Sequence, residues 1–161
     1  MIALIALDES AISVRAAREA RHLFPNAEFL VINVGRRIVP WLGTGEFGMV
    51  YPAPAPMIEE AMPDDELETL AETAGVHPTD VITVIGDPAH AICEAAEKHD
   101  VDVIVVGSHD KGVFRRLIEP SVAQAVLHNT HRPVLIVGGT KADEKNEEAA
   151  AAEATAAVVE A

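Results

Sequence analysis

The stretch covering residues 103–137 constrains the fold of this 161-residue chain more than any other part of the sequence. It opens with four β-branched residues in a row, from Val103 to Val106, and continues through a glycine-bearing loop and an amphipathic segment. It closes with a second apolar run at 133–137. Uninterrupted β-branched runs are typical of strands buried on both faces of a parallel sheet, and the amphipathic segment fits a connecting helix. The stretch therefore predicts one strand–helix–strand unit of a parallel α/β fold.

The loop inside this unit lies where parallel α/β folds bind ligands, at the carboxyl end of a strand. Gly107 falls at that end, and Ser121 opens the next helix with Gln124 three residues later, which is the spacing of a capping box. Free main-chain amides at such a helix start can hold an anion.

This loop and the strand after it resemble the signature of the universal stress protein family, G-x2-G-x9-G-[S/T], which precedes a helix and a short P-V-L-[IV]-V strand. The resemblance extends in element order from Ile2 to Val137. The positions that match are Gly107, Ser108, His109, Gly112, Arg116, Leu117, Ser121, Val122 and residues 133–137. The chain departs from the signature at two glycines, which are replaced here by Asp110 and Pro120.

The resemblance implies a binding site for ATP or AMP, with Mg²⁺ as a possible companion of the nucleotide. Asp8 would lie beside the adenosine half, and the backbone at the end of the second strand, at Ile32 and Val34, would meet the adenine ring. The other implied nucleotide-binding residues are Gly107, Ser108, His109, Gly112, Ser121 and Val122. A second role is open for Asp8, as a strand-end carboxylate that accepts hydrogen bonds from loop amides.

The two departures from the signature bear on the phosphate end of this site. Asp110 places a carboxylate where triphosphate oxygens would lie, and Pro120 removes one amide donor. Like charges about 4 Å apart repel by about 1 kcal/mol in water and several-fold more near a protein surface. Three alternatives remain open: Lys111, Arg115 and Arg116 offset the charge, Asp110 holds a bridging Mg²⁺, or Asp110 pairs with Arg115. We expect the nucleotide site to be weakened or lost.

The remaining apolar runs complete a single sheet. They predict strands at residues 2–7, 29–34 and 81–85. Helices are predicted between them, with Ser10 or Ser13 as the first cap, and Asp87 as the cap before Pro88. Five parallel strands joined by right-handed crossovers give a doubly wound, Rossmann-like sheet in the order 3-2-1-4-5, with helices on both faces. Asn33 is polar within its apolar strand, and we expect it either to face the crevice or to bond neighbouring loops.

One domain is predicted over residues 1–138, followed by an alanine- and glutamate-rich tail at 139–161 that is mobile or marginally helical. Residues 35–63 read as a long loop rich in proline, glycine and aromatic residues. Because it holds Trp41 and Tyr51, the single Trp and the single Tyr, we expect it to cover the domain or a partner subunit. Its G-x-G-x-x-G-x-V motif at 43–50 lacks the preceding strand and following helix of a dinucleotide-binding site, so we interpret its glycines as residues of flexible turns.

The net charge limits the kinds of partner that the chain can bind, and the cysteine content indicates its compartment. The 26 carboxylates and 12 Lys and Arg residues give a net charge of −14, which argues against nucleic acid or an anionic membrane as the main partner. Cys93 is the single cysteine and is predicted to be a small buried hydrophobe in a reducing compartment. The amino-terminal apolar run is too short for a signal peptide, so a cytoplasmic location is expected.

No catalytic residue and no metal site is predicted. His128 and His131 lie three residues apart on one helix, but no third ligand has matching spacing. His109 lies between Ser108 and Asp110, yet sequence neighbours rarely adopt the geometry of a catalytic triad, and no nucleophile elbow is present.

By resemblance, the chain is expected to be a stress-response regulatory module that acts through an unidentified regulatory protein partner. The family pairs its last strand with a copy in a second subunit, so a homodimer through the edge strand Val134 to Val137 is expected; an open apolar edge would also favour aggregation if left bare. An ATP- or AMP-binding sensor with at most slow hydrolysis is the alternative. A substrate-adenylating enzyme is a third hypothesis, but the loop after strand one lacks the glycines of a pyrophosphate loop.

Overall fold

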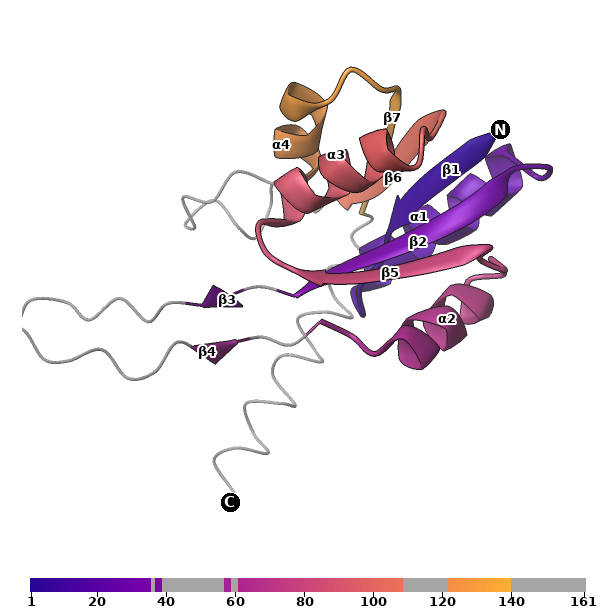
Figure 1. The fold of residues 1–161 in the computed structure, drawn as a ribbon. Coiled ribbons are helices and arrows are strands. Elements are labelled where there is room, and N and C mark those ends of the chain that lie inside the picture. The colour runs from indigo at the N-terminus through magenta and orange to yellow at the C-terminus, as the bar shows by residue number, and fades with distance from the viewer. Residues whose placement is uncertain (36, 39–56, 59–60, 109–121, 140–161) are drawn as a thin grey trace, which may run out of the picture.

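The computed structural model describes residues 1–35, 37–38, 57–58, 61–108 and 122–139. Five parallel strands form one sheet in the order β5-β2-β1-β6-β7 (Figure 1). The strands are β1 (Ile2–Ala6), β2 (Glu28–Gly35), β5 (Asp80–Ile85), β6 (Val103–Ser108) and β7 (Val134–Gly138). Numbered along the chain as the five strands of this sheet, the order is 3-2-1-4-5, so the predicted doubly wound sheet is confirmed.

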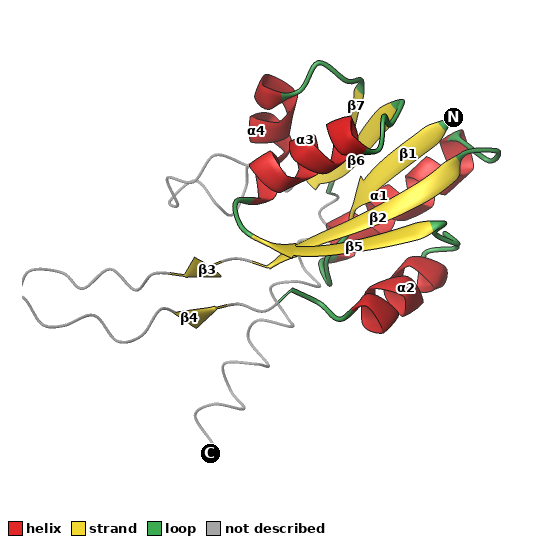
Figure 2. Ribbon diagram, viewed as in Figure 1, coloured by secondary structure: helices red, strands yellow, loops and turns green. Residues whose placement is uncertain are grey.

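Helices cover both faces of the sheet (Figure 2). α1 (Ala11–Leu23) and α2 (Asp64–Thr73) pack on one face, and α3 (Pro88–Lys98) and α4 (Val122–Asn129) pack on the other. Successive residues of a strand point to opposite faces, so in β1 Ile5 joins the cluster of α1 and α2 while Leu4 joins that of α3 and α4. Burial on both faces explains why the central strands are apolar at nearly every position.

The helix starts follow the predicted capping chemistry. The Ser10 hydroxyl accepts the Ser13 N–H at 3.2 Å and caps α1, so the first of the two serines considered is the cap. Asp87 accepts the His90 N–H at 2.8 Å and caps α3, with Pro88 at the first helical position. Leu23, the last residue of α1, is 53% exposed, and Phe24, directly after the helix, packs on the core.

The segment predicted as one long loop contains two short strands, one near each of its ends, that pair with each other. β3 (Arg37–Ile38) pairs antiparallel with β4 (Met57–Ile58), and the pair projects away from the sheet (Figure 1). The covering role expected for Trp41 and Tyr51, and the motif at 43–50, lie outside the described residues. The tail from residue 140 lies outside them as well, whereas Gly139 donates its N–H to the Ser108 carbonyl at 3.0 Å.

A cationic clamp ties the loop before β7 to the end of α3. The Arg132 guanidinium donates to the Val101 carbonyl at 2.6 Å and pairs with Glu97 at 3.1 Å and Asp100 at 2.8 Å. The hydrogen bond from Arg132 lowers the pKa of the Glu97 carboxyl, and its two acidic partners raise the pKa of the guanidinium. The clamp joins the loop before β7 to the turn that leads into the amino-terminal end of β6.

Cys93 is half-buried on α3, with its Sγ 3.9 Å from the Val126 carbonyl of α4. Burial, together with the charges of Glu97 and Asp87, raises the pKa of the thiol. A raised pKa favours the unreactive thiol form over the thiolate, in keeping with a packing role. Within the described ranges, no helix is long and apolar enough to cross a lipid bilayer.

Candidate functional site

The order of the strands reverses between β1 and β6, and the crevice at the carboxyl ends of these strands is the candidate site. The described part of the crevice is formed by the loop after β1, the first turn of α1, and the ends of β2 and β6. Of the predicted site residues, Asp8, Ile32, Val34, Gly107, Ser108 and Val122 are described. His109, Gly112 and Ser121 lie outside the described residues, as do Asp110 and Pro120.

Asp8 is exposed, and its carboxylate takes part in the loop that carries it. Its Oδ1 accepts the Ser10 N–H at 2.9 Å. The buried Ser13 hydroxyl holds the same loop, since it accepts the Asp8 N–H at 3.1 Å and donates to the Asp8 carbonyl at 2.7 Å. The structure therefore displays the second role considered for Asp8, that of a strand-end carboxylate bonded to its own loop, while its role beside adenosine stays a prediction.

Val34 presents its main chain to the crevice because β2 is longer than β1. The Ile32 carbonyl accepts the Leu7 N–H at 2.9 Å on the β1 side, and the Gly35 carbonyl accepts the Gly86 N–H at 2.9 Å on the β5 side. Consecutive residues of a strand direct their main-chain groups to alternating sides, so Val34 faces the same side as Ile32. β1 ends at Ala6, so the N–H and C=O of Val34 point into the space past the end of that strand.

Asn33 supports this edge of the crevice from within the protein, with only 8% of its surface exposed. Its Nδ2 donates to the Leu7 carbonyl at 2.9 Å, and its Oδ1 accepts the Met62 N–H at 2.9 Å. Of the two roles considered for Asn33, the structure shows the bonding of neighbouring loops. Both ends of the buried amide are satisfied, and they fix the ends of β1 and β2 and the segment before α2.

Gly107 has a packing role that the sequence did not reveal. A Cβ at Gly107 would lie 2.7 Å from Cγ2 of Ile12, and one at Gly139 would lie 2.8 Å from its Cδ1. Ile12 is 1% exposed, so the first turn of α1 is pressed against the carboxyl ends of β6 and β7. The only signal for this contact was an apolar residue two positions after the cap Ser10.

Arg15 of α1 donates to the Gly138 carbonyl at 3.3 Å in an exposed hydrogen bond. This guanidinium lies at the carboxyl end of β7, on the same side of the sheet as the crevice. Ser108 is half-buried at the end of β6, and Val122, the first residue of α4, packs against the core cluster of α3 and α4. Among the described residues, no group of three His, Cys, Asp or Glu side chains is placed to hold a metal ion.

A doubly wound sheet with its crevice at the reversal of strand order defines a Rossmann-like α/β protein. The model of the universal stress protein family matches residues 1–138. The universal stress protein MJ0531 of Methanocaldococcus jannaschii is 32% identical over 140 residues, which cover 83% of this chain and 79% of that protein. YxiE, a universal stress protein of Bacillus subtilis, is 32% identical over 145 residues, which cover 83% of this chain and 96% of that protein.

The fold agrees with these sequence matches. The crystal structure of a universal stress protein in complex with cAMP superposes with a TM-score of 0.55 at 20% identity, covering 85% of this chain and 96% of that one. This chain belongs to the universal stress protein family, as its loop signature predicted.

Proposed function

We propose that this chain is a stress-response regulatory module with an adenine-nucleotide site that keeps its adenosine end and is weakened at its phosphate end. The observation that carries the proposal is the main chain of Val34, whose N–H and C=O face the crevice beyond the end of β1. A related family member crystallised with cAMP supports an adenine nucleotide as the ligand class.

The adenosine end has the chemistry that an adenine ring requires. Adenine carries a donor and an acceptor side by side on one edge, and one residue of an open strand edge offers the complementary pair. Apolar side chains of the strand ends would flank the ring, and such sites commonly combine an apolar lining with a few fixed polar groups. The loop from Asp8 to Ser13 is held by three hydrogen bonds of Asp8 and Ser13, so the nearby polar groups are positioned before any ligand arrives.

The phosphate end is proposed to be weak for two reasons. A carboxylate at Asp110 repels phosphate oxygens, and Pro120 offers no amide in the segment that leads into α4. Gly107, which the family signature implies for close approach to a phosphate, is required here by the contact with Ile12 in any case. The presence of a glycine at position 107 is therefore not by itself evidence that the loop binds phosphate.

The proposed adenine contact is tested by titrating the ¹⁵N-labelled protein with AMP and following the backbone amide signals. We expect the signals of Leu7, Asp8 and Val34 to shift together along one saturable curve. The Val84 amide on the outer strand β5 serves as an internal control and is expected to stay in place. Shifts that leave Val34 unmoved at saturation would refute the adenine contact.

We further propose a homodimer formed through β7, one of the two edge strands of the sheet. β7 pairs with β6 on one side, and no described strand covers its second side. Ile136 on this edge strand is 39% exposed, and an open edge of apolar residues is a favourable surface for a second copy. The dimer would join two sheets into one and leave both crevices at strand ends.

A further inference from the structure

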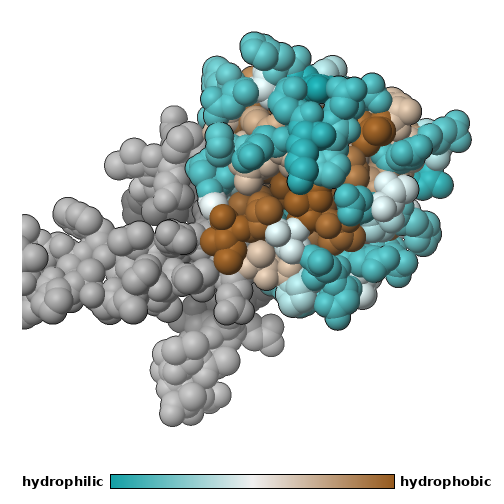
Figure 3. Space-filling model, viewed as in Figure 1, coloured by the Kyte–Doolittle hydropathy of each residue, from teal (hydrophilic) through white to brown (hydrophobic). Residues whose placement is uncertain are grey.

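The edge of the sheet opposite β7 is formed by β5. β5 pairs with β2 on its inner side, and no described strand lies on its outer side. Val84 is 36% exposed and Ile85 is 50% exposed, and Ile82 is half-buried beside them. Figure 3 shows apolar surface along this strand, bordered by polar residues. Exposed apolar area on an unpaired strand edge is typical of an interaction surface.

The main-chain groups on this edge can be assigned from the register. Gly86, directly after the strand, donates its N–H inward to β2 at 2.9 Å, so the alternation of the strand places the groups of Thr83 and Ile85 on the outer side. The N–H of Val81, also on the outer side, is bonded at 3.0 Å by the Asp80 carboxylate. Within the described part of the chain, the edge is thus closed at its start by Asp80 and open from Thr83 to the end.

Side chains above and below the edge differ in polarity. On the face of α3, Ile82 packs on the core cluster and Val84 follows it two residues later, so this face is apolar. On the face of α2, Thr83 donates its hydroxyl to the Asp64 carboxylate at 2.6 Å, so the acidic start of α2 borders the edge directly. An added strand would meet apolar groups on one face, and on the other the carboxylates of α2 beside the apolar side chains of Val81 and Ile85.

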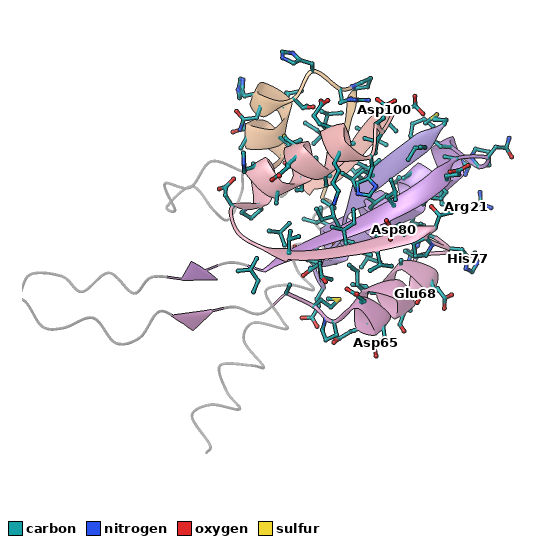
Figure 4. The ribbon with its side chains drawn as sticks, in the orientation of Figure 1. Arg21, Asp65, Glu68, His77, Asp80 and Asp100 are labelled. Carbon is teal, nitrogen blue, oxygen red and sulfur yellow. The ribbon has the colours of Figure 1, made fainter. Side chains whose placement is uncertain are left out.

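The segment that contains α2 and β5 is acidic. Residues 61–87 contain seven carboxylates and no lysine or arginine. Figure 4 shows Asp80 on β5, and Glu68 and Asp65 on the neighbouring α2. Such a surface attracts a cationic partner over a distance of about a Debye length, ~8 Å at physiological salt.

A second copy of this chain is a poor match for the edge. Antiparallel pairing of two β5 strands about a two-fold axis would place both α2 helices on the same face of the joined sheet. Each α2 begins with Asp64, Asp65 and Glu66, so the pairing would bring like charges together. Acidic residues beside an edge strand are a common protection against such self-association.

We propose that the β5 edge binds an extended basic segment of a partner protein, which adds a sixth strand to the sheet by main-chain hydrogen bonds to Thr83 and Ile85. Residues of the segment alternate, with apolar side chains beside Ile82 and Val84 and with Lys or Arg toward Asp64 and its neighbours. The proposal specifies the chemistry of the partner in the proposed regulatory role. It does not depend on nucleotide binding, so either the partner segment or the nucleotide site can be refuted without the other.

The test uses a fluorescent twelve-residue peptide in which valine and lysine alternate. Its control is an isomer of equal composition and charge, in which pairs of valines follow pairs of lysines, so that no strand face is purely apolar. We expect the alternating peptide to bind at least about tenfold more tightly by fluorescence anisotropy, and to shift the amide signals of residues 83–86. Equal binding of the two isomers, or binding of neither, would overturn the proposal.

Two lysine variants separate the edge from the general negative charge of the protein. Ile85→Lys places a cation on the edge at a residue that is 50% exposed, and Leu23→Lys places the same charge at the end of α1 at a residue that is 53% exposed. Ile85→Lys is expected to weaken the alternating peptide at least about tenfold and Leu23→Lys by less than about twofold. Circular dichroism checks that both variants are folded.

Two further outcomes would count against a basic partner segment. Equal loss of binding in both variants would mean that the peptide responds only to net charge. Self-association of the wild-type protein that Ile85→Lys abolishes and Leu23→Lys retains would assign the edge to a second copy of the chain.

Discussion

Ile12 shows how one side chain joins the fold to the candidate site. It fills the space that a Cβ at Gly107 or Gly139 would occupy, with closest distances of 2.7 and 2.8 Å. The two glycines therefore let α1 approach the ends of β6 and β7. Ser10 at the helix cap and Asp8 in the preceding loop are held in the same turn, so packing and site geometry share residues.

Gly107→Ala tests this contact. The added methyl group meets the side chain of Ile12 and, at 3.1 Å, its main chain, so we expect the free energy of unfolding to fall by about 1–3 kcal/mol in urea denaturation. Gly86→Ala is the matched control, because its Cβ would have no neighbour within 4 Å, and it is expected to change stability by less than about 0.5 kcal/mol.

Combining Gly107→Ala with Ile12→Ala sharpens the result. Removal of Cγ2 from Ile12 makes room for the new methyl group, so the double variant should lose less stability than the sum of the two single losses. Strict additivity of the two losses would show that the contact does not limit residue 107.

At the scale of single residues, local contacts could be predicted from the sequence and long-range contacts could not. Asp87 was predicted as a cap, and Ser10 as one of two candidates, because capping depends on partners three residues away. Ile12 and Gly107 are 95 positions apart in the chain, and Asn33 and Met62 are 29 apart. Contacts between residues so far apart produce no local sequence pattern from which they could be predicted. The open main chain of Val34 depends on the relative lengths of β1 and β2, which only the register determines.

At the scale of elements, the central strands and four helices followed from apolar periodicity, and the two-residue strands β3 and β4 did not. A strand of two residues is too short to show alternation, so the segment containing them was interpreted as a loop. The two edge strands are distinguished by their surroundings. β7 lies away from the acidic α2, whereas β5 is bordered by it, so we assign β7 to self-pairing and β5 to a basic partner.

The proposed pairing of β7 is tested with Ile136→Lys. A lysine on this edge strand is a common block to strand pairing, and in a two-fold dimer it appears twice, so we expect the variant to be monomeric at concentrations where the wild type is dimeric. Size-exclusion chromatography with light scattering measures the mass of each. Leu23→Lys serves as the control with equal added charge and should remain dimeric; a wild type that is already monomeric would contradict the proposal.

The molecule as a whole combines a conventional family fold with an altered signature loop. The sheet order and the match over residues 1–138 place the chain in the universal stress protein family, while Asp110 and Pro120 replace two of its signature glycines. On our proposal, the chain has lost phosphate affinity while the adenosine end of the site and the two strand edges remain able to bind. On this account, the number of phosphates on a nucleotide adds little to its affinity.

Calorimetric titration of the nucleotide-free protein with AMP and with MgATP tests this account most directly, using Asp110→Gly/Pro120→Gly as the restored variant. We predict that the wild type binds MgATP no more tightly than AMP, and that the restored variant gains at least about tenfold for MgATP and much less for AMP. A wild type that binds MgATP at micromolar concentration, and more tightly than AMP, would contradict the account and establish a nucleotide sensor whose loop employs the Asp110 carboxylate.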